Sequence, residues 1–88
     1  MTLFRRYIQA ALRKAKYSYD DETKSFVAVV EELPLCWGQG DTHEEAREEL
    51  ENVIEGWVLL SIQRGEKLPS IDNVAMIIPH KKEEPEYA

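Results

Sequence analysis

The chain has 88 residues, and its 17 acidic side chains outnumber its 11 basic ones, which gives a formal net charge of -6. This length allows a single domain, and so small a domain buries only about 60–65% of the surface of its unfolded chain. The acidic balance argues against nonspecific nucleic-acid binding, which needs lysine and arginine to displace counterions. It suits a basic protein partner, although negative charge also commonly serves solubility alone.

The single cysteine, Cys36, cannot form an internal disulfide, so nothing indicates an oxidising compartment. No N-terminal apolar run resembles a signal peptide, and no apolar stretch is long enough to cross a membrane. We therefore expect a cytoplasmic protein without membrane association.

Apolar residues at helical spacing predict a short helix over residues 2–15, with Thr2 as a candidate N-cap. Its apolar stripe consists of Phe4, Ile8, Ala11, Leu12 and Ala15. Five basic residues up to position 16 make this end of the chain a candidate phosphate or RNA contact. A solvated face that balances acidic residues elsewhere is the favoured interpretation, because few aromatic residues or glycines could frame a groove.

Two antiparallel strands are predicted over residues 16–19 and 25–30, with a polar loop of hairpin length between them. Side chains 26, 28 and 30 would share one face of the second strand, and Val27 and Val29 the other. A strand that is apolar on both faces is usually central or covered on both sides. The loop carboxylates at 20–22 lack the glycine and spacing of a calcium loop, so we expect no metal site there.

Pro34 ends the second strand, and a short third strand is predicted over residues 36–40. A nucleophilic pair of Cys36 with His43 or His80 is the enzymatic alternative, but no third group that would orient the pair is evident. We expect Cys36 to be a small buried apolar residue, and we expect no catalytic residues and no cofactor.

The organising element is a long helix predicted over residues 42–64. Thr42 and Glu45 form a capping box, in which the glutamate would reach back to the N–H of Thr42, and Gly65 is a natural C-terminal stop. Apolar residues at helical period should face the sheet, with Trp57 as the largest buried anchor. The stripe consists of Ala46, Leu50, Val53, Ile54, Trp57, Val58 and Ile62.

A last strand is predicted over residues 74–78, and the charged tail at 79–88 should remain flexible. The expected fold is α+β: an N-terminal helix, a three-stranded antiparallel meander, a long helix packed on the sheet and a final short strand. Residues 1–78 would form the domain.

The order of these segments resembles the HicB antitoxin family. The resemblance rests on FVAVV at 26–30, ELPLCW at 32–37, GDTHEEA at 40–46 and GEKLP at 65–69. The third block is the most specific of the four. The resemblance implies a partial ribonuclease-H-like fold and a non-enzymatic antitoxin. Such a protein binds a small basic RNA-cleaving toxin similar to HicA.

Three departures limit what is carried over from the family. The glycine that commonly follows the family's proline is replaced by Leu35 and Cys36, and the N-terminal helix is an addition to the shortest members. Only residues 81–88 remain after the last predicted strand and the Pro79-His80 pair that ends it, too few for a helix-turn-helix or ribbon-helix-helix, so we expect no DNA-binding segment. No spaced set of four carboxylates that would hold two metals is evident, so no nuclease activity is expected.

Acidic residues are the candidates for binding a basic toxin: Glu44, Glu48, Glu51 and Glu55 on the long helix, with Glu31 and Glu32 near the end of the sheet. Gly56, Leu59 and Leu60 are the candidate contacts of a homodimer, or of a tetramer built from it. Gly56 also suggests a close approach by the N-terminal helix or a second subunit. The alternative function is an orphan oligomer that acts as a structural or regulatory subunit without a toxin.

Overall fold

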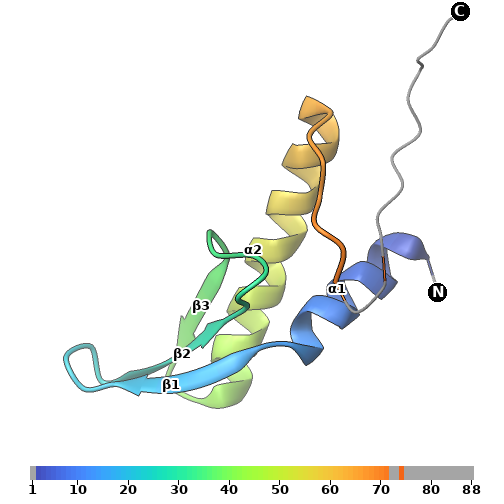
Figure 1. Cartoon of the computed structure of the whole chain (residues 1–88). Coiled ribbons are helices and arrows are strands. Elements are labelled where there is room, and N and C mark those ends of the chain that lie inside the picture. The colour runs from blue at the N-terminus through green and yellow to red at the C-terminus, as the bar shows by residue number, and fades with distance from the viewer. Residues whose placement is uncertain (1, 72–73, 75–88) are drawn as a thin grey trace, which may run out of the picture.

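The computed structural model describes residues 2–71 and 74 of the chain. Its elements are α1 (Leu3–Arg13), β1 (Lys16–Asp20), β2 (Ser25–Val29), β3 (Trp37–Gly40) and α2 (His43–Arg64). The predicted α+β fold is confirmed for these five elements (Figure 1). The predicted strand at 74–78 and the tail at 79–88 lie outside the described residues, except for Val74, which forms an isolated antiparallel bridge with Ile71.

The three strands form an antiparallel meander in the order β1-β2-β3, so β2 is the central strand, as predicted. Ala28 pairs with Tyr17 on one side and with Gly38 on the other. Because directly paired residues share a face of the sheet, these three residues point toward the same side. In the β1–β2 turn, the carboxylate of Asp20 accepts a hydrogen bond of 3.0 Å from the backbone N–H of Glu22.

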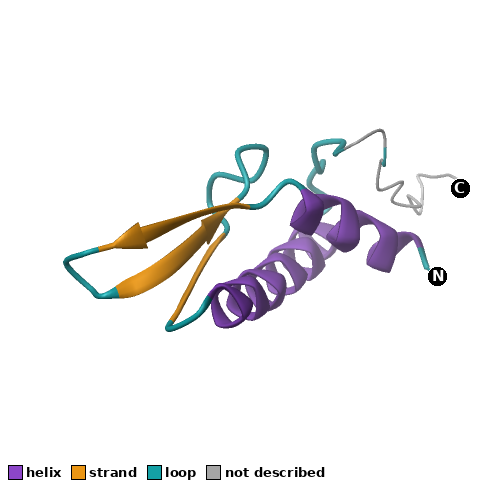
Figure 2. Ribbon diagram, turned by 90° about the horizontal axis from the view of Figure 1, so that it is seen from below, coloured by secondary structure: helices purple, strands orange, loops and turns teal. Residues whose placement is uncertain are grey.

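The helices and the sheet form two layers, seen from below in Figure 2. Ala28 and Val30 are buried against the helices, whereas Val29 on the opposite face is 39% exposed. The second face of β2 is therefore open to solvent in the part of the chain that the structure describes. Two tight turns follow β2, in which Val30 and Leu33 each accept a backbone hydrogen bond at about 3 Å.

The ends of α2 follow the predicted capping chemistry, with one difference. The hydroxyl of Thr42 accepts from the N–H of Glu45 at 3.0 Å, and Gly65 ends the helix in the left-handed region with φ of 70°. The carboxylate of Glu45, however, accepts from the N–H of Asp41 at 2.8 Å rather than from that of Thr42. The glutamate of the capping box thus bonds the residue before the N-cap rather than the N-cap itself.

Glycines allow β3 and α2 to pack in close contact. A Cβ at Gly38 would lie 2.3 Å from the carbonyl oxygen of Ala46 and 2.4 Å from the backbone nitrogen of Leu50, both on α2. A Cβ at Gly40 would lie 2.5 Å from the Cβ of Glu45. The backbone of α2 therefore lies directly over β3, at a distance that no side chain at these two positions would permit.

The buried face of α2 is a row spaced by about four residues, consisting of Ala46, Leu50, Ile54, Val58 and Ser61. The prediction that Trp57 is the largest buried anchor is wrong, because this side chain is only partly buried. The 22 residues of α2 span about 33 Å, whereas a five-residue strand spans about 17 Å. The second half of the helix thus extends beyond the sheet that was expected to cover Trp57 (Figure 1).

Helix α1 supplies much of the remaining core. Its N-cap is Thr2, whose hydroxyl accepts from the N–H of Arg5 at 3.1 Å, as predicted. Its buried residues are Tyr7, Ile8, Ala10, Ala11 and Leu12. The expected stripe omitted Tyr7, which is fully buried and is the largest of the fully buried side chains.

Candidate partner-binding surface

The first turns of α2 and the residue before its cap form an acidic cluster, defined as Asp41, Glu44, Glu45, Glu48 and Glu49. All five of these side chains are exposed. Carboxylates at this end of a helix are favoured because the backbone N–H groups give it a partial positive charge. Glu45 is engaged in the cap, so the other four carboxylates offer most of the negative charge that a partner could meet.

Glu51 and Glu55, which were also predicted to bind the partner, face α1 instead. The guanidinium of Arg5 lies 3.6 Å from the carboxylate of Glu51 and 3.5 Å from that of Glu55. Both glutamates are therefore partly neutralised within the chain. Their geometry fits a contact between α1 and α2.

Glu31 and Glu32 follow β2 and lie away from the start of α2. Phe26 pairs with Gly40 beside that start, whereas Val29, at the other end of β2, pairs with Trp37. Glu31 forms an ion pair of 3.0 Å with Lys16. The six predicted partner-binding acids are thus divided among three places, and only Glu44 and Glu48 belong to the acidic cluster.

The predicted oligomer contacts lie on exposed parts of α2. A Cβ at Gly56 would meet nothing within 4 Å, so the expected close approach by the N-terminal helix is wrong. Leu59 and Leu60 are 53% and 43% exposed. A contact of these three residues with a second subunit stays a prediction.

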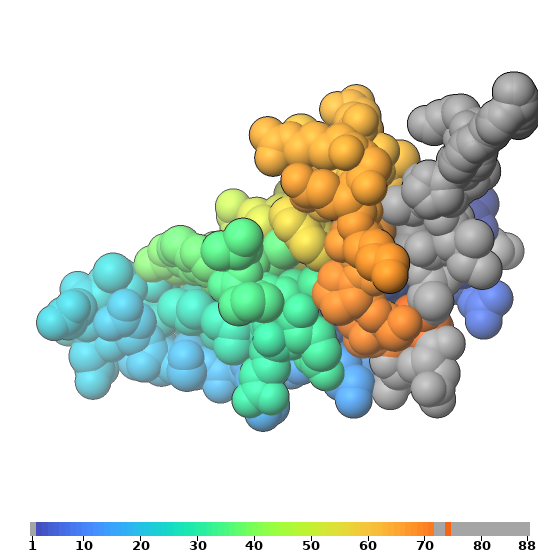
Figure 3. All heavy atoms as spheres, turned by 45° about the horizontal axis from the view of Figure 1, so that its top comes forward, coloured from blue at the N-terminus to red at the C-terminus, as the bar shows by residue number. Residues whose placement is uncertain are grey.

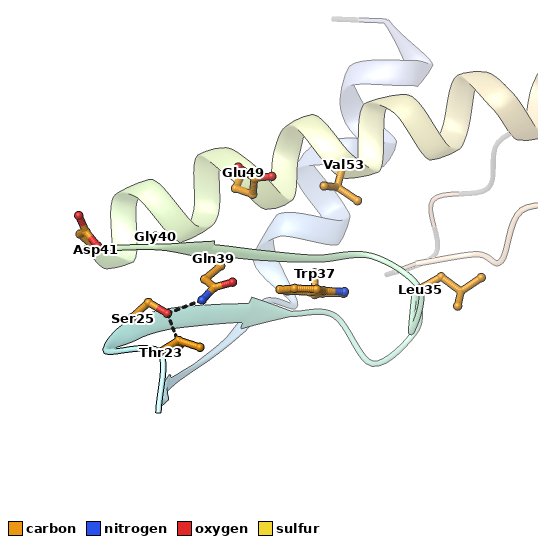
Figure 4. Close-up of a pocket in the computed structure, with 9 residues that line it drawn as sticks. All are labelled: Thr23, Ser25, Leu35, Trp37, Gln39, Gly40, Asp41, Glu49 and Val53. Atoms are coloured by element: carbon orange, nitrogen blue, oxygen red, sulfur yellow. Dashed lines mark hydrogen bonds between the residues drawn. The ribbon is translucent and has the colours of Figure 1, made fainter. Parts of the chain in front are cut away.

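Sequence reasoning missed a groove of about 610 Å³ along β3. Its walls come from three segments: the β1–β2 turn with the start of β2, the β2–β3 connection with β3, and one flank of α2 (Figure 4). The lining residues are Thr23, Ser25, Leu35, Trp37, Gln39, Gly40, Asp41, Glu49 and Val53. In the space-filling view of Figure 3, the β2–β3 connection (green) lies at the surface. The sequence shows three consecutive apolar residues here, Leu35, Cys36 and Trp37. An extended chain cannot bury all three on one face, and in the structure Leu35 and Trp37 are exposed on either side of buried Cys36.

The floor of this groove is ordered by a small hydrogen-bond network. The side-chain amide of Gln39 donates to the hydroxyl of Ser25 at 2.6 Å, and the hydroxyls of Ser25 and Thr23 are also 2.6 Å apart. Ser25 is only 6% exposed, so these bonds satisfy a nearly buried hydroxyl. The network ties β2 to β3 and fixes the side chain of Gln39 within the groove.

The surroundings of Cys36 do not favour a nucleophilic thiol. The thiol is 1% exposed, and its burial raises its pKa above the ordinary value. Because the thiolate is the reactive form, this burial lowers the reactivity of Cys36 at neutral pH. His43 packs instead against the rings of Tyr17 and Phe26, with ring centroids 5.2 Å and 4.4 Å away.

Neither a metal site nor a membrane span is found in the described part of the chain. No group of three or more His, Cys, Asp or Glu side chains there could hold a metal ion. Within the same residues, no helix is long and apolar enough to cross a membrane.

Comparisons with known proteins place the chain in a family. The crystal structure of TTHA0281 from Thermus thermophilus superposes with a TM-score of 0.83 at 30% sequence identity, covering 91% of this chain and 99% of that one. Among curated proteins, no sequence matches. The family model described as UPF0150-like matches residues 6–69, which include most of α1, all three strands and the whole of α2. The chain therefore belongs to the UPF0150-like family.

Proposed function

We propose that this protein is a non-enzymatic antitoxin of the HicB kind, which binds and neutralises a small basic RNA-cleaving toxin. The observation that carries the proposal is the acidic cluster at the start of α2, whose carboxylates are exposed. The sequence block that most resembles HicB antitoxins, at 40–46, contributes Asp41, Glu44 and Glu45 to that same cluster.

The chemistry of the partner follows from what a toxin must do. A protein that cleaves RNA needs a basic surface to hold phosphates, and an antitoxin that covers this surface competes with the RNA. An acidic surface opposite a basic one steers the two proteins together and raises the association rate. The acidic cluster has the sign of charge that this task requires.

The experiment begins with purification of the tagged protein from its native host, to recover a small basic partner. The association rate of the two proteins should fall as ionic strength rises, since exposed charges are screened within about 10 Å at 0.1 M salt. The double variant Glu44→Lys/Glu48→Lys should slow association by about tenfold or more at low salt, with the fold intact.

A matched control is available at the opposite end of α2. The triple variant Gln63→Lys/Glu66→Lys/Ser70→Lys changes the net charge equally, and all three residues are exposed at or beyond the C-terminal end of the helix. This control should associate at close to the wild-type rate. Equal slowing in both variants would mean that net charge alone attracts the partner, and that the acidic cluster has no particular role.

The alternative is an orphan oligomer that acts as a structural or regulatory subunit. The exposed side chains of Leu59 and Leu60 favour a protein contact that does not depend on charge. Recovery of the protein only with copies of itself, with no small basic protein encoded beside it, would favour this alternative.

A further inference from the structure

The free edge of β3 offers unused backbone hydrogen bonds. The sheet order is β1-β2-β3, so β3 pairs with β2 on one side and with no described strand on the other. An edge strand presents a row of N–H and C=O groups that can pair with another extended segment. The groove described above follows this edge (Figure 4).

The groove also offers contacts for side chains. Trp37 is 52% exposed and Leu35 is 81% exposed, and the partly buried Val53 on α2 lines the same groove. When an extended peptide adds to a sheet edge, its main chain supplies affinity and its alternate side chains supply specificity through such pockets. Gly38 faces α2, so Trp37 points to the open face of the sheet, and an apolar side chain of the added segment would lie beside Trp37 while its neighbour in sequence points toward Val53.

The charges of the groove select the occupant. Asp41 and Glu49 are the charged residues in its lining, and both are acidic. A segment that alternates basic and apolar side chains would place its basic residues against these carboxylates. A second copy of this chain would instead bring its own Asp41 and Glu49 to the same edge, which is unfavourable.

Geometry also argues against a second copy. Antiparallel pairing of two identical β3 strands would place both α2 helices on the same side of the joined sheet. Paired strands lie about 4.8 Å apart, but packed helices need about 8–10 Å between their axes. Because the backbone of α2 lies directly over Gly38, the two helices would overlap. A segment without a helix above it has no such conflict.

We propose that the free edge of β3 binds an extended basic and apolar segment of the partner protein as a fourth strand. This inference rests on the proposed function, since the partner that supplies the segment is the basic toxin. It adds a main-chain contact to the electrostatic one at the start of α2. The two contacts are continuous, because Asp41 and Glu49 belong to both the acidic cluster and the groove.

The test uses the basic partner protein recovered by co-purification and the full chain. Trp37→Ala and Val53→Lys should each weaken binding about tenfold or more, mainly through faster dissociation. Tyr19→Ala is the control for the first variant, because Tyr19 is 51% exposed on β1. Asn52→Lys is the control for the second, because it adds the same charge at an exposed neighbouring position on α2. Both controls should bind like the wild type.

Hydrogen exchange supplies a second measurement that does not depend on the folding of any variant. The backbone amides of residues 37–40 that point away from β2 should exchange more slowly in the complex than in the free wild-type protein. Unchanged exchange of these amides in a complex that forms would overturn the inference and leave the proposed function standing. Slow exchange that appears without partner as protein concentration rises would overturn it too, by showing that a second copy occupies the edge. Absence of any basic partner for the wild type would overturn both proposals.

Discussion

The hydroxyl of Tyr7 donates a hydrogen bond of 2.6 Å to the carbonyl oxygen of Pro69, which lies 62 positions later in the chain. Tyr7 belongs to α1, and Pro69 to the segment that returns along the molecule after α2 (Figure 1). This bond satisfies the one polar atom of the largest fully buried side chain. It joins the two ends of the described domain.

Ionisation of Tyr7 should make the fold sensitive to alkaline pH. Burial, with a smaller effect of the charge of Cys36, raises the pKa of Tyr7 from 10.0 to about 12. The folded state therefore holds the phenol proton more tightly than the unfolded state, so this stabilisation is complete below pH 10 and is lost as pH rises toward about 12. Urea unfolding from about pH 9 to 12 should show a steeper loss of stability for wild type than for Tyr7→Phe.

At neutral pH the same variant should lose about 1 kcal/mol, the usual net contribution of one hydrogen bond. Tyr19→Phe is the control, because the side chain of Tyr19 is half exposed to solvent. If Tyr7→Phe and wild type lose stability in parallel between about pH 10 and 12, the phenol does not carry the alkaline transition.

Alanine substitutions at Gly38 of β3 and Gly56 of α2 should change the stability of the fold in opposite directions. Gly38→Ala forces a Cβ to within 2.3 Å of α2 backbone, so the helix must move and packing is lost. We expect destabilisation of about 2 kcal/mol or more, the range of overpacked sites. Gly56→Ala places its Cβ in open space and should raise the stability of the dilute protein by up to about 1 kcal/mol. Thermal unfolding of the two variants decides this, and equal effects would contradict the close packing of α2 on β3.

Truncations along α2 test which side of the helix is buried. Leu50→Ala and Ile54→Ala remove fully buried side chains and should each cost about 2–5 kcal/mol. Trp57→Ala removes a larger but only partly buried side chain and should cost less than either. If urea unfolding shows a larger loss of stability for Trp57→Ala than for Leu50→Ala, Trp57 is the main buried anchor of α2 after all.

Local signals predicted the elements and their ends. Thr2, Thr42 and Gly65 act through backbone groups within a few residues, so their side chains or conformational freedom reveal the helix ends in the sequence alone. The apolar residues on both faces of β2 likewise indicated its central place in the sheet. The burial of Cys36 was also expected from its type and position.

Longer-range packing was not predictable in the same way. The burial of Tyr7 depends on an acceptor at Pro69, and nothing near Tyr7 in sequence indicates it. The partial exposure of Trp57 depends on the length of the sheet, which ends before α2 does. The division of the six candidate acids follows from Arg5 and Lys16, whose ion pairs are set by the tertiary arrangement. The groove was not predicted because its walls come from three segments that are separate in the sequence.

Self-association through the second half of α2 is the last prediction. Leu59 and Leu60 are exposed beyond the end of the sheet, and Gly56 leaves an open position one turn earlier. A small residue lets two helices approach closely, and exposed leucines supply apolar area. Gly56 and Leu60 follow Glu49 and Val53 at helical spacing, so this surface continues the α2 wall of the groove toward the end of the helix. Sedimentation at tens of micromolar should give a mass near twice the 10.2 kDa of one chain, or a multiple of that dimer.

Two variants and a control make the self-association test specific. Gly56→Leu and Leu60→Lys should each shift the protein toward a folded monomer, because one blocks close approach and the other places a charge in the contact. Gln63→Lys adds a charge at an exposed position on the same helix and should keep the wild-type mass. A wild-type monomer of 10.2 kDa under these conditions would contradict the prediction. A dimer that both variants leave intact would instead move the contact to another surface, such as the open face of the sheet around Val29.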